Sequence, residues 1–571
     1  MTAAVGVLRA FGQDPTPSPT PIDTDPSGTA AEELQGVPFI APNFRSDERE
    51  LPDLGRVGVD MTDQRPISIR EAIALALENN KDIEVTRKNV RIAEFDLQAA
   101  RGFNQPRLIG NTIYERATLP NVSIFSTNRD FTQGSLSTSA AIQGYIPNFG
   151  TVIRAESTNQ RITTDNPISI LSPQLNAGLG VTVTQPLLRG RGFDQPRRVI
   201  EIAKRNLSLT DTQFRQRSIE IIAGVQRAYW DLAFALRNLQ VQRDGVRDAK
   251  TQLEHNRRLV EEGQLAPIDI VAAETQVALF EQSVYEALDV VTQTENALKN
   301  LILPNRHDRM WGESLTPVDS VDLRAPATTL TVALASAMEN RPELELINVQ
   351  RDINEVDRRF YRDQTRPQVD LIAGYTSAGV GGSQNPDFSA PFPLPCQTDP
   401  NSPACQQQQT NLDALTGNPY GGVFSNRYPT FRVGVQINLP LFGDKTARAQ
   451  LGRTLVEGER IETQREQIEQ NIQVEVRNAL QAVRTAEARL RSAAIARENS
   501  FRQYESEQRK LDSGQSDIYA VLERQTALTT ARSTELRAQT ELNKAIADLQ
   551  RATGNSLKDN DVETRLRNPL K

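Results

Sequence analysis

The chain contains an internal duplication, and this feature constrains its fold more than any other. The segment from Ile69 to Asn80 returns as the segment from Leu330 to Arg341. Three shorter landmarks return in the same order: Gln105-Pro106-Arg107 as Arg366-Pro367-Gln368, Gln185-Pro186-Leu187-Leu188 as Leu439-Pro440-Leu441-Phe442, and Glu262-Gly263-Gln264 as Ser513-Gly514-Gln515. The copies lie about 250 to 260 residues apart, so the chain is expected to form two halves of one elongated unit.

Composition argues against a membrane-spanning helix and against a nucleic-acid partner. Charged residues make up 24% of the 571 residues, and the mean hydropathy is −0.48. No run of about 18 apolar residues occurs, whereas a transmembrane strand would need only about 9–11 alternating residues and stays possible. The net charge is −7, with Lys and Arg scattered among Asp and Glu, so we expect no nucleic acid as partner.

The sequence offers little material for catalysis. Two His and two Cys leave almost nothing for a metal site or for a Cys–His or Ser–His nucleophile. No isolated carboxylate pair indicates a hydrolase. The glycines around Gly178 and Gly190 lack the strand–GxGxxG–helix context of a phosphate loop. We therefore expect a protein that is not an enzyme and that has no catalytic, metal or cofactor site.

Both cysteines, Cys396 and Cys405, lie in one segment rich in Pro, Asn and Ser. Such a segment is a loop, and a local disulfide between the two would indicate an oxidising compartment. The alternative is a pair of unpaired loop thiols.

The N-terminal region has a different composition from the rest. Residues 3–8 are apolar and are interpreted as the remnant of a signal segment, although no Lys/Arg-rich start precedes them. Residues 14–66 are rich in Pro, Thr, Asp and Gly, which predicts a disordered extension. No cysteine near the start offers a site for lipid attachment.

The two halves follow the same expected order of helix, strands, long helix, tight turn and returning helix. In the first half Ser68, with Glu71 three residues later, predicts a capped helix start. The segments expected in the first half are a helix over 68–101, strands within 107–188, a long helix over 196–262 and a return helix after Pro267. Those expected in the second half are a helix over 329–362, strands near 368–377 and 430–439, a long loop over 378–428, and helices over 445–512 and 517–551.

The long helices carry a coiled-coil pattern, and the last strand alternates. Apolar residues recur at spacings of three and four in Ile222, Val225, Tyr229, Leu232, Leu236 and Leu239. This is a heptad seam, and the short link at Gly263 and Pro267 makes the two helices a helical hairpin. On the last strand Phe431, Val433 and Val435 alternate with polar or small residues. Such a strand suits either a sandwich or a barrel, and the long hairpins favour a barrel.

These landmarks resemble the TolC-like outer-membrane efflux protein family over about residues 66–554. The marks are Ala228-Tyr229-Trp230-Asp231-Leu232, Thr184-Gln185-Pro186-Leu187-Leu188, and the turns Gly263-Gln264-Leu265-Ala266-Pro267-Ile268-Asp269 and Gly514-Gln515-Ser516-Asp517-Ile518. No single mark is specific, but their order, spacing and duplication are.

The resemblance implies a mixed α and β fold made mainly of long coiled-coil helices. Three copies would each give four strands to a twelve-stranded β-barrel in the bacterial outer membrane and helices to a tunnel across the periplasm. Residues 303–327 and the segment after Gly554 would lie near a belt around the tunnel. The first half holds four strand-like runs where two would suffice, with an extended hairpin expected around Tyr145 to Thr151.

The resulting domain division has four parts. Residues 1–66 are the signal remnant and extension, 67–328 the first repeat, 329–554 the second repeat, and 555–571 a C-terminal tail near the belt.

The resemblance also implies site residues and partners. The turns would dock a periplasmic adaptor protein that links the trimer to an inner-membrane pump or transporter, through Gly263, Gln264, Leu265, Gly514, Gln515 and Ser516. Acidic residues just after the turns would narrow the entrance. Asp269 and Glu523 fit this pattern, while Ala520 departs from it, and Arg524 offers a pairing partner that would hold the entrance shut. For both acids the alternative is an ordinary first-turn carboxylate.

The sequence is compatible with three functions. The first is a passive export conduit for efflux or type I secretion. The second is a structural coiled-coil tether without a channel, which gives no reason for two-faced strands at matched places in both halves. The third is an enzyme on a helical scaffold. Tyr229 and Trp230 are expected to pack between helices rather than to contact cargo.

Overall fold

The structure is a computed structural model that describes residues 55–122, 128–321, 324–390, 393–440 and 443–562. Most of the predicted extension, residues 1–54, and the end of the predicted tail, residues 563–571, lie outside the described residues. Among the described helices none has an apolar stretch long enough to cross a membrane.

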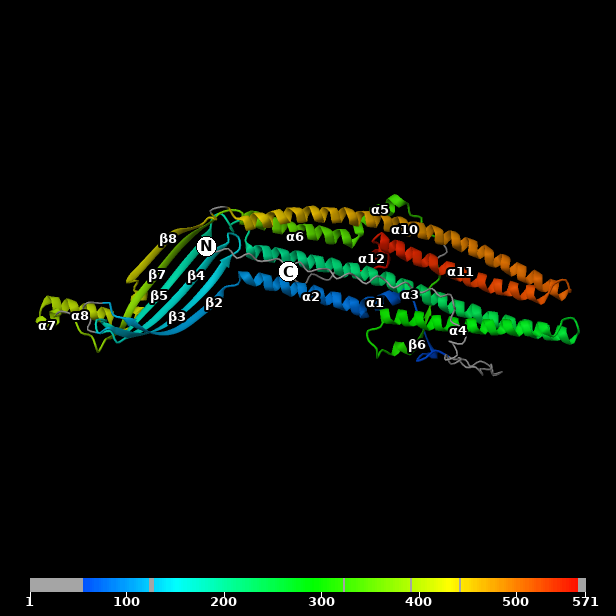
Figure 1. Cartoon of the computed structure of the whole chain (residues 1–571), viewed down its shortest axis with the longest axis horizontal. Helices are drawn as coiled ribbons and strands as arrows, with labels where there is room; N and C mark the ends of the chain where they lie inside the picture. Colours follow the sequence, from blue (N-terminus) through cyan, green and yellow to red (C-terminus); the bar gives the residue numbers. More distant parts are fainter. Residues whose placement is uncertain (1–54, 123–127, 322–323, 391–392, 441–442, 563–571) are drawn as a thin grey trace, which may run out of the picture. The chain divides into compact units, whose positions relative to one another are not determined.

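Each half contains a pair of short helices, a long helix and a return helix (Figure 1). In the first half these are α1 (Ile69–Asn79), α2 (Lys81–Arg101), α3 (Gln195–Glu261) and α4 (Ile268–Ile302). In the second half they are α5 (Leu330–Asn340), α6 (Pro342–Gln364), α10 (Lys445–Asp512) and α11 (Ile518–Ala552), followed by the short α12 (Ser556–Asp559).

The single helix predicted over 68–101 is two helices. Asn80 has an extended backbone at φ −61° and ψ 130°, and its side chain accepts hydrogen bonds from the amides of Asp82 and Ile83. It therefore ends α1 and caps α2 at one position. In the second half Arg341 takes the same extended conformation, and Pro342 opens α6.

The helices next to the sheet form a layer in the order α2, α3, α6, α10, because α3 packs between α2 and α6 and α6 packs against α10. Ion pairs join α3 to α6 along their length, at Arg198–Asp357 (2.7 Å) and Arg205–Asp352 (2.9 Å). The side-chain amide of Asn354 donates to the carbonyl of Thr454 and joins α6 to α10.

One antiparallel sheet has the strand order β2-β3-β4-β5-β7-β8. Its strands are β2 (Arg107–Pro120), β3 (Asp130–Ile146), β4 (Thr151–Thr164), β5 (Leu171–Pro186), β7 (Gln368–Gln384) and β8 (Tyr428–Asn438). The expectation of four strands per chain is wrong, since the sheet has six. The hairpin expected around Tyr145 to Thr151 pairs along its full length as β3 and β4 and adds two strands between β2 and β5.

A second, two-stranded sheet lies beside the helices. β1 (Asp60–Ile67) pairs in parallel with β6 (Glu313–Pro317), which follows the 3-10 turn Arg309–Trp311. The predicted extension over 1–66 is therefore too long, since its last residues form a strand. Parallel pairing with a strand about 250 residues away leaves no local signal in a polar segment.

Tyr229 fixes this small sheet to the middle of α3. Its ring is fully buried, and its hydroxyl donates to the carboxylate of Asp319 and accepts from the amides of Val318 and Asp319. Trp230 packs edge-on against Tyr229. Burial and the hydrogen bond to Asp319 raise the pKa of Tyr229 above its ordinary value. Both aromatic residues are packing residues, as predicted, and the largest hydrophobic cluster among the described residues surrounds them.

Candidate functional site

The turn between α3 and α4 is a tight helix end. Gly263 has φ +74°, a conformation that glycine adopts without steric cost. Its amide donates to the carbonyl of Val260 at 3.0 Å, and the amide of Gln264 donates to that of Leu259 at 2.8 Å. This pair of bonds is a Schellman motif, which satisfies the last carbonyls of α3. Gly263 and Gln264 are exposed, and Leu265 is half-buried.

The turn between α10 and α11 repeats this geometry. Gly514 has φ +71°, its amide donates to the carbonyl of Leu511, and the amide of Gln515 donates to that of Lys510. The hydroxyl of Ser516 bonds to the carboxylate of Glu507, whose pKa is lowered by this bond and by Lys510. The six residues predicted for docking thus lie on two turns of the same construction.

The two acids predicted at the entrance differ in their surroundings. The carboxylate of Asp269 is half-buried and accepts from the amide of Ala266 at 3.1 Å, so it also stabilises the turn. Glu523 is exposed on the second turn of α11. Within the described ranges neither acid forms an ion pair, and Arg524 does not pair with Glu523. Ala520, the departure from the acidic pattern, donates its amide to the cap residue Asp517.

The first turns of α4 and α11 lie against each other. The side-chain amide of Gln276 donates to the hydroxyl of Thr526 at 3.0 Å. A groove of about 400 Å³ lies between the helices and includes Glu523 in its lining, together with apolar side chains of Ile268, Val271, Tyr519 and Leu522. Asp269 does not line this groove.

One face of the six-stranded sheet is mainly apolar, although it also carries Arg116 and Arg161. Strand pairing places side chains from every strand on this face: Leu108, Leu136, Ile142, Ile153, Val181, Val183, Leu371, Tyr375, Phe431, Val433 and Val435. Several are almost fully open to solvent in the single chain, including Leu108 at 76%, Phe431 at 78% and Val433 at 79%. An apolar surface of this extent on a soluble monomer would be unusual and marks a surface that meets lipid or protein.

The opposite face is mainly polar, with Ile109, Ile113, Val152 and Ile372 among its apolar residues. It carries the alternating residues of the same strands: Asn111, Ser135, Ser137, Ser139, Gln143, Arg154, Glu156, Thr158, Thr182, Thr184, Thr376, Arg432 and Gln436. Arg154 and Glu156 form an ion pair of 2.8 Å on this face. One sheet therefore offers an apolar surface on one side and a surface fit for water on the other.

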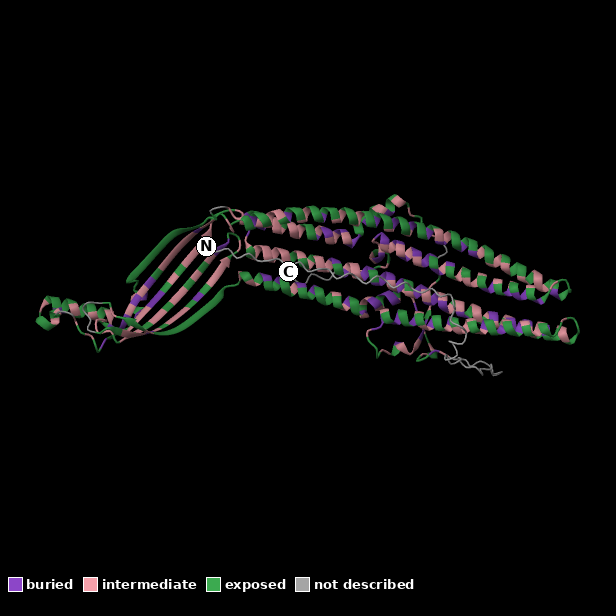
Figure 2. Cartoon of the chain, in the orientation of Figure 1, coloured by how far each residue is buried: buried purple, intermediate pink, exposed green. Residues whose placement is uncertain are grey.

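The sheet is open at both edges. β2 and β8 each pair with a neighbour on one side only in the described part of the chain. Every described residue of β8 is exposed, as are nearly all of β2 (Figure 2). Long, unpaired and apolar edge strands normally require another strand to pair with.

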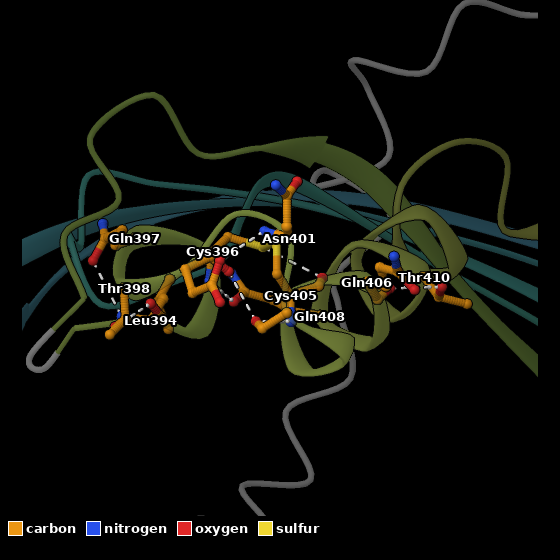
Figure 3. Close-up of a disulfide and its surroundings, with 11 residues drawn as sticks. Leu394, Cys396, Gln397, Thr398, Asn401, Cys405, Gln406, Gln408 and Thr410 are labelled. Atoms are coloured by element: carbon orange, nitrogen blue, oxygen red, sulfur yellow. Dashed lines mark hydrogen bonds between the residues drawn. A yellow bond between two sulfur atoms is a disulfide. The ribbon is translucent and has the colours of Figure 1, made fainter.

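The loop between β7 and β8 lies at the end of the sheet opposite the helices (Figure 1). It contains α7 (Pro395–Thr398), α8 (Pro403–Leu415) and α9 (Tyr420–Phe424). Cys396 and Cys405 form a disulfide that joins α7 to α8, and Cys405 is buried (Figure 3). The amide of Cys396 also donates to the side chain of Gln408.

α9 packs on the apolar side of the sheet. The hydroxyl of Tyr420 bonds to Asn159 on β4, and Ser377 on β7 donates to the carbonyl of Val423. A Cβ at Gly379 would lie 1.9 Å from the carbonyl oxygen of Pro419, so only glycine permits this approach. Asn159, Ser377 and Gly379 share the side of Val181 and Phe431, which leaves the polar face free of α9.

A buried charged cluster fixes the two-stranded sheet to α4. Arg56 pairs with Glu295, and Lys299 lies 3.3 Å from Glu295 and donates to the carbonyls of Trp311 and Glu313. Burial lowers the pKa of Lys299 despite the neighbouring carboxylate. Sequence reasoning missed this cluster because Arg56 fell within the predicted extension. No group of three or more His, Cys, Asp or Glu suited to a metal occurs among the described residues.

Comparison with known proteins agrees with this geometry. The model of the family described as "Outer membrane efflux protein" matches residues 72–302 and 333–555, one segment in each half. A search of curated proteins gives no match.

Solved structures share the fold. The CmeC outer membrane channel of Campylobacter jejuni is 14% identical, covering 90% of this chain and 94% of its own, with a TM-score of 0.57. The open state of the MtrE outer membrane channel of Neisseria gonorrhoeae is 17% identical, covering 86% of this chain and 89% of its own, with a TM-score of 0.56. The outer membrane protein VceC of Vibrio cholerae is 12% identical, covering 85% and 96%, with a TM-score of 0.57.

Proposed function

The chain belongs to the outer membrane efflux protein family, and from this premise we propose that three copies assemble side by side into one passive export conduit. As a member of this family, the protein is a subunit of an outer-membrane efflux channel whose helices form a tunnel in the periplasm. The family consists of transport conduits and not of enzymes, and its channels form homotrimers that work with adaptor and pump partners.

The main observation that supports a trimer is the open sheet with its two different faces. The six described strands, with one mainly apolar and one mainly polar face, do not close on themselves, so both edges need partners. Pairing β8 of one copy with β2 of the next satisfies both edges with three identical contacts, as cyclic symmetry requires. The apolar face then meets outer-membrane lipid and the polar face lines the channel.

The helical layer continues the conduit into the periplasm. Three layers of α2, α3, α6 and α10 side by side would enclose a tunnel below the barrel. The two-stranded sheet of β1 and β6, with α12 packed on α3, would form the belt around it. A coiled-coil tether without a channel would have no use for a sheet with one lipid-compatible face.

Under this proposal the repeats over 67–328 and 329–554 each contribute one helical hairpin to the tunnel, and the tail from residue 555 lies at the belt. The two Schellman turns are the farthest points of these hairpins from the sheet, so they are the surfaces that a periplasmic adaptor of an inner-membrane pump or type I secretion transporter would meet. Gly263, Gln264, Leu265, Gly514, Gln515 and Ser516 are the contact residues that we propose.

The acids beyond the turns would form the entrance. Three copies would give one ring of Asp269 and one of Glu523, and carboxylate rings favour and bind cations. Glu523 is exposed and has no ion-pair partner among the described residues, so its carboxylate is available to form such a ring.

Single-channel recording in planar lipid bilayers tests this function. The purified trimer is expected to conduct with cation selectivity, and the double variant Asp269→Asn with Glu523→Gln is expected to lose both that selectivity and block by divalent cations added at the periplasmic side. Glu505→Gln, on the exposed side of α10 near the same turn, is the matched control and should behave as the parent. Absence of conductance from a correctly folded trimer would contradict the conduit.

A further inference from the structure

The number of strands exceeds the number of helices that enter the sheet. α2 leads into β2, β5 leads into α3, α6 leads into β7, and β8 leads into α10. The helices of the layer thus follow the same order as the strands to which they connect. Only the hairpin of β3 and β4 has no helix of its own, and it lies between β2 and β5.

The hairpin of β3 and β4 is an integral part of the six-stranded sheet, which would form the wall of the barrel. β3 pairs with β2 from Asp130 to Gln143, and β4 pairs with β5 from Val152 to Ile162. Its side chains alternate like those of the other strands. Leu136 and Ile142 lie on the apolar face, while Ser137 and Gln143 lie on the polar face. A plug folded inside a lumen would not need a lipid-compatible side.

The turn of the hairpin is fixed at the helical end of the sheet. The side-chain amide of Gln185 donates to the carbonyl of Phe149 at 3.0 Å. The hydroxyl of Tyr145 donates to Asp194, the residue that caps α3. The hairpin is therefore anchored to the connection between β5 and α3, where the wall meets the tunnel.

The width of the sheet is close to that of the helical layer when β3 and β4 are counted as part of the sheet. Four helices packed about 8–10 Å apart span about 32–40 Å. Six strands about 4.8 Å apart and tilted by about 40° span about 38 Å around a barrel, whereas four strands span about 25 Å. The six-stranded sheet matches the helical layer beneath it, so the conduit need not narrow at the outer membrane.

We propose that the hairpin of β3 and β4 widens the exit, so that three copies close an eighteen-stranded barrel that passes large hydrophilic cargo. Its circumference corresponds to a backbone diameter of about 36 Å and, with about 5 Å of side chain on each inner wall, to a lumen of about 25 Å. A twelve-stranded barrel of the same tilt would leave about 14 Å. Barrels of 16–18 strands hold aqueous channels.

The lining favours hydrophilic cargo. The hairpin contributes Ser135, Ser137, Ser139, Arg154, Glu156 and Thr158 to the polar face. α9 packs on the apolar side of the strands, so this helix does not close the wide exit. A cargo of about 20 Å hydrated diameter would pass the barrel, and the entrance rather than the exit would set the size limit.

This inference rests on the proposed function, and single-particle imaging of the full-length protein in lipid nanodiscs tests the two separately. Three-fold particles with eighteen strands in the barrel are the expected result. Three-fold particles with twelve strands, and β3 and β4 folded out of the wall, would overturn the wide exit and leave the conduit intact. Particles without a barrel would overturn both.

Access of neutral polyethylene glycols gives a second readout on the same protein. Graded polymers are added only on the outer side of a bilayer that holds single channels. Polymers up to about 20 Å across are expected to enter the barrel and lower the conductance, whereas a twelve-stranded barrel would exclude all those wider than about 14 Å. Exclusion at the smaller size would contradict the proposal even if imaging failed to resolve the strands.

Discussion

The two halves of the chain have nearly identical helices and very different strand regions. α1 and α5 have 11 residues each, α3 and α10 have 67 and 68, and α4 and α11 have 35 each. The first half has four strands with short connections, and the second has two strands separated by a long loop with a disulfide. Helices that pack side by side along their length must keep equal lengths, while the far end of a sheet tolerates insertions.

The halves also differ at the two-stranded sheet of β1 and β6. Tyr229 on α3 fixes β1 and β6, whereas the corresponding position on α10, counted from the turn glycines, is Leu480. Leu480 is buried in a purely apolar cluster between α10 and α11. The duplicated helix thus serves as a support for a second sheet in one half and as a simple packing partner in the other.

The largest effect is expected from a charge on the apolar face of an edge strand. Val433→Arg on β8 should destabilise the reconstituted trimer by about 2–4 kcal/mol per copy, because the side chain would lie in lipid. Gln436→Arg on the same strand, three residues along and on the polar face, should change the stability by less than about 0.5 kcal/mol. Denaturant titration in lipid vesicles measures both. Equal effects would show that the two faces have been assigned wrongly.

The next effect concerns the loop that only the second half has. Replacing Cys396 and Cys405 by Ser opens a short disulfide loop, which costs about 2–3 kcal/mol in the chain-entropy view. The cost should appear as faster proteolysis between α7 and α8 and leave the trimer intact. Loss of the trimer in this variant would show that the loop also supports the barrel.

A smaller effect is expected at Tyr229. Tyr229→Phe leaves the amide of Asp319 without its acceptor, whereas the amide of Val318 still donates to the carbonyl of Ile67, and should cost about 1–3 kcal/mol at pH 8. The raised pKa of Tyr229 means that the unfolded chain releases this proton at a lower pH than the folded protein does. The stabilisation is therefore complete below about pH 10 and is lost as the pH rises further.

The variant should accordingly lose less stability than the parent between about pH 10 and pH 12. Tyr519→Phe, at an exposed position on α11, is the control and should follow the parent at every pH. If the alkaline loss of stability of Tyr229→Phe equals that of the parent, the hydrogen bonds of this hydroxyl do not fix the two-stranded sheet to α3.

The smallest effect is expected at the two turns, where the halves are most alike. Gly263→Ala and Gly514→Ala place a Cβ at a left-handed backbone and should each cost about 1–2 kcal/mol. Hydrogen exchange of the neighbouring amides measures the local loss. Gly224→Ala and Gly452→Ala, in the interiors of α3 and α10 with no atom near the new Cβ in the single chain, should instead be neutral or stabilising by up to about 1 kcal/mol. If the two Gly→Ala variants lose different amounts of stability, the two turns have the same backbone geometry but not the same energetics.

The sequence predicts the bounds of the long helices closely because particular residue types mark their ends. The expected spans 196–262 and 445–512 compare with Gln195–Glu261 and Lys445–Asp512 in the structure. Glycine after each helix and Pro or Asp before the next leave little freedom in the boundaries. The break at Asn80 was missed because the apolar periodicity continues across it. Asn80 is both the C-cap of α1 and the N-cap of α2, and its side chain is the only local sign of this.

The number of strands in the sheet and the pairing of β1 with β6 were harder to predict from the sequence. The four strand-like runs of the first half were visible as composition, but nothing local decides whether a hairpin joins a wall or extends from it. That outcome depends on pairing with β2 and β5. The two turns were found from their glycines, whereas the roles proposed for these turns and for Asp269 and Glu523 depend on neighbouring molecules that no single sequence describes.

The unpaired edges have a consequence for the time before assembly. A lone copy that has folded its sheet presents β2 and β8 and the apolar face together, and such a species associates indiscriminately with other exposed strands. In the proposed trimer, closure of the barrel needs three copies, so the rate of closure falls steeply at low protein concentration while the risk of wrong pairing persists. Selection should therefore favour sheet formation late, at the lipid surface, after the helical part has already brought the copies into register.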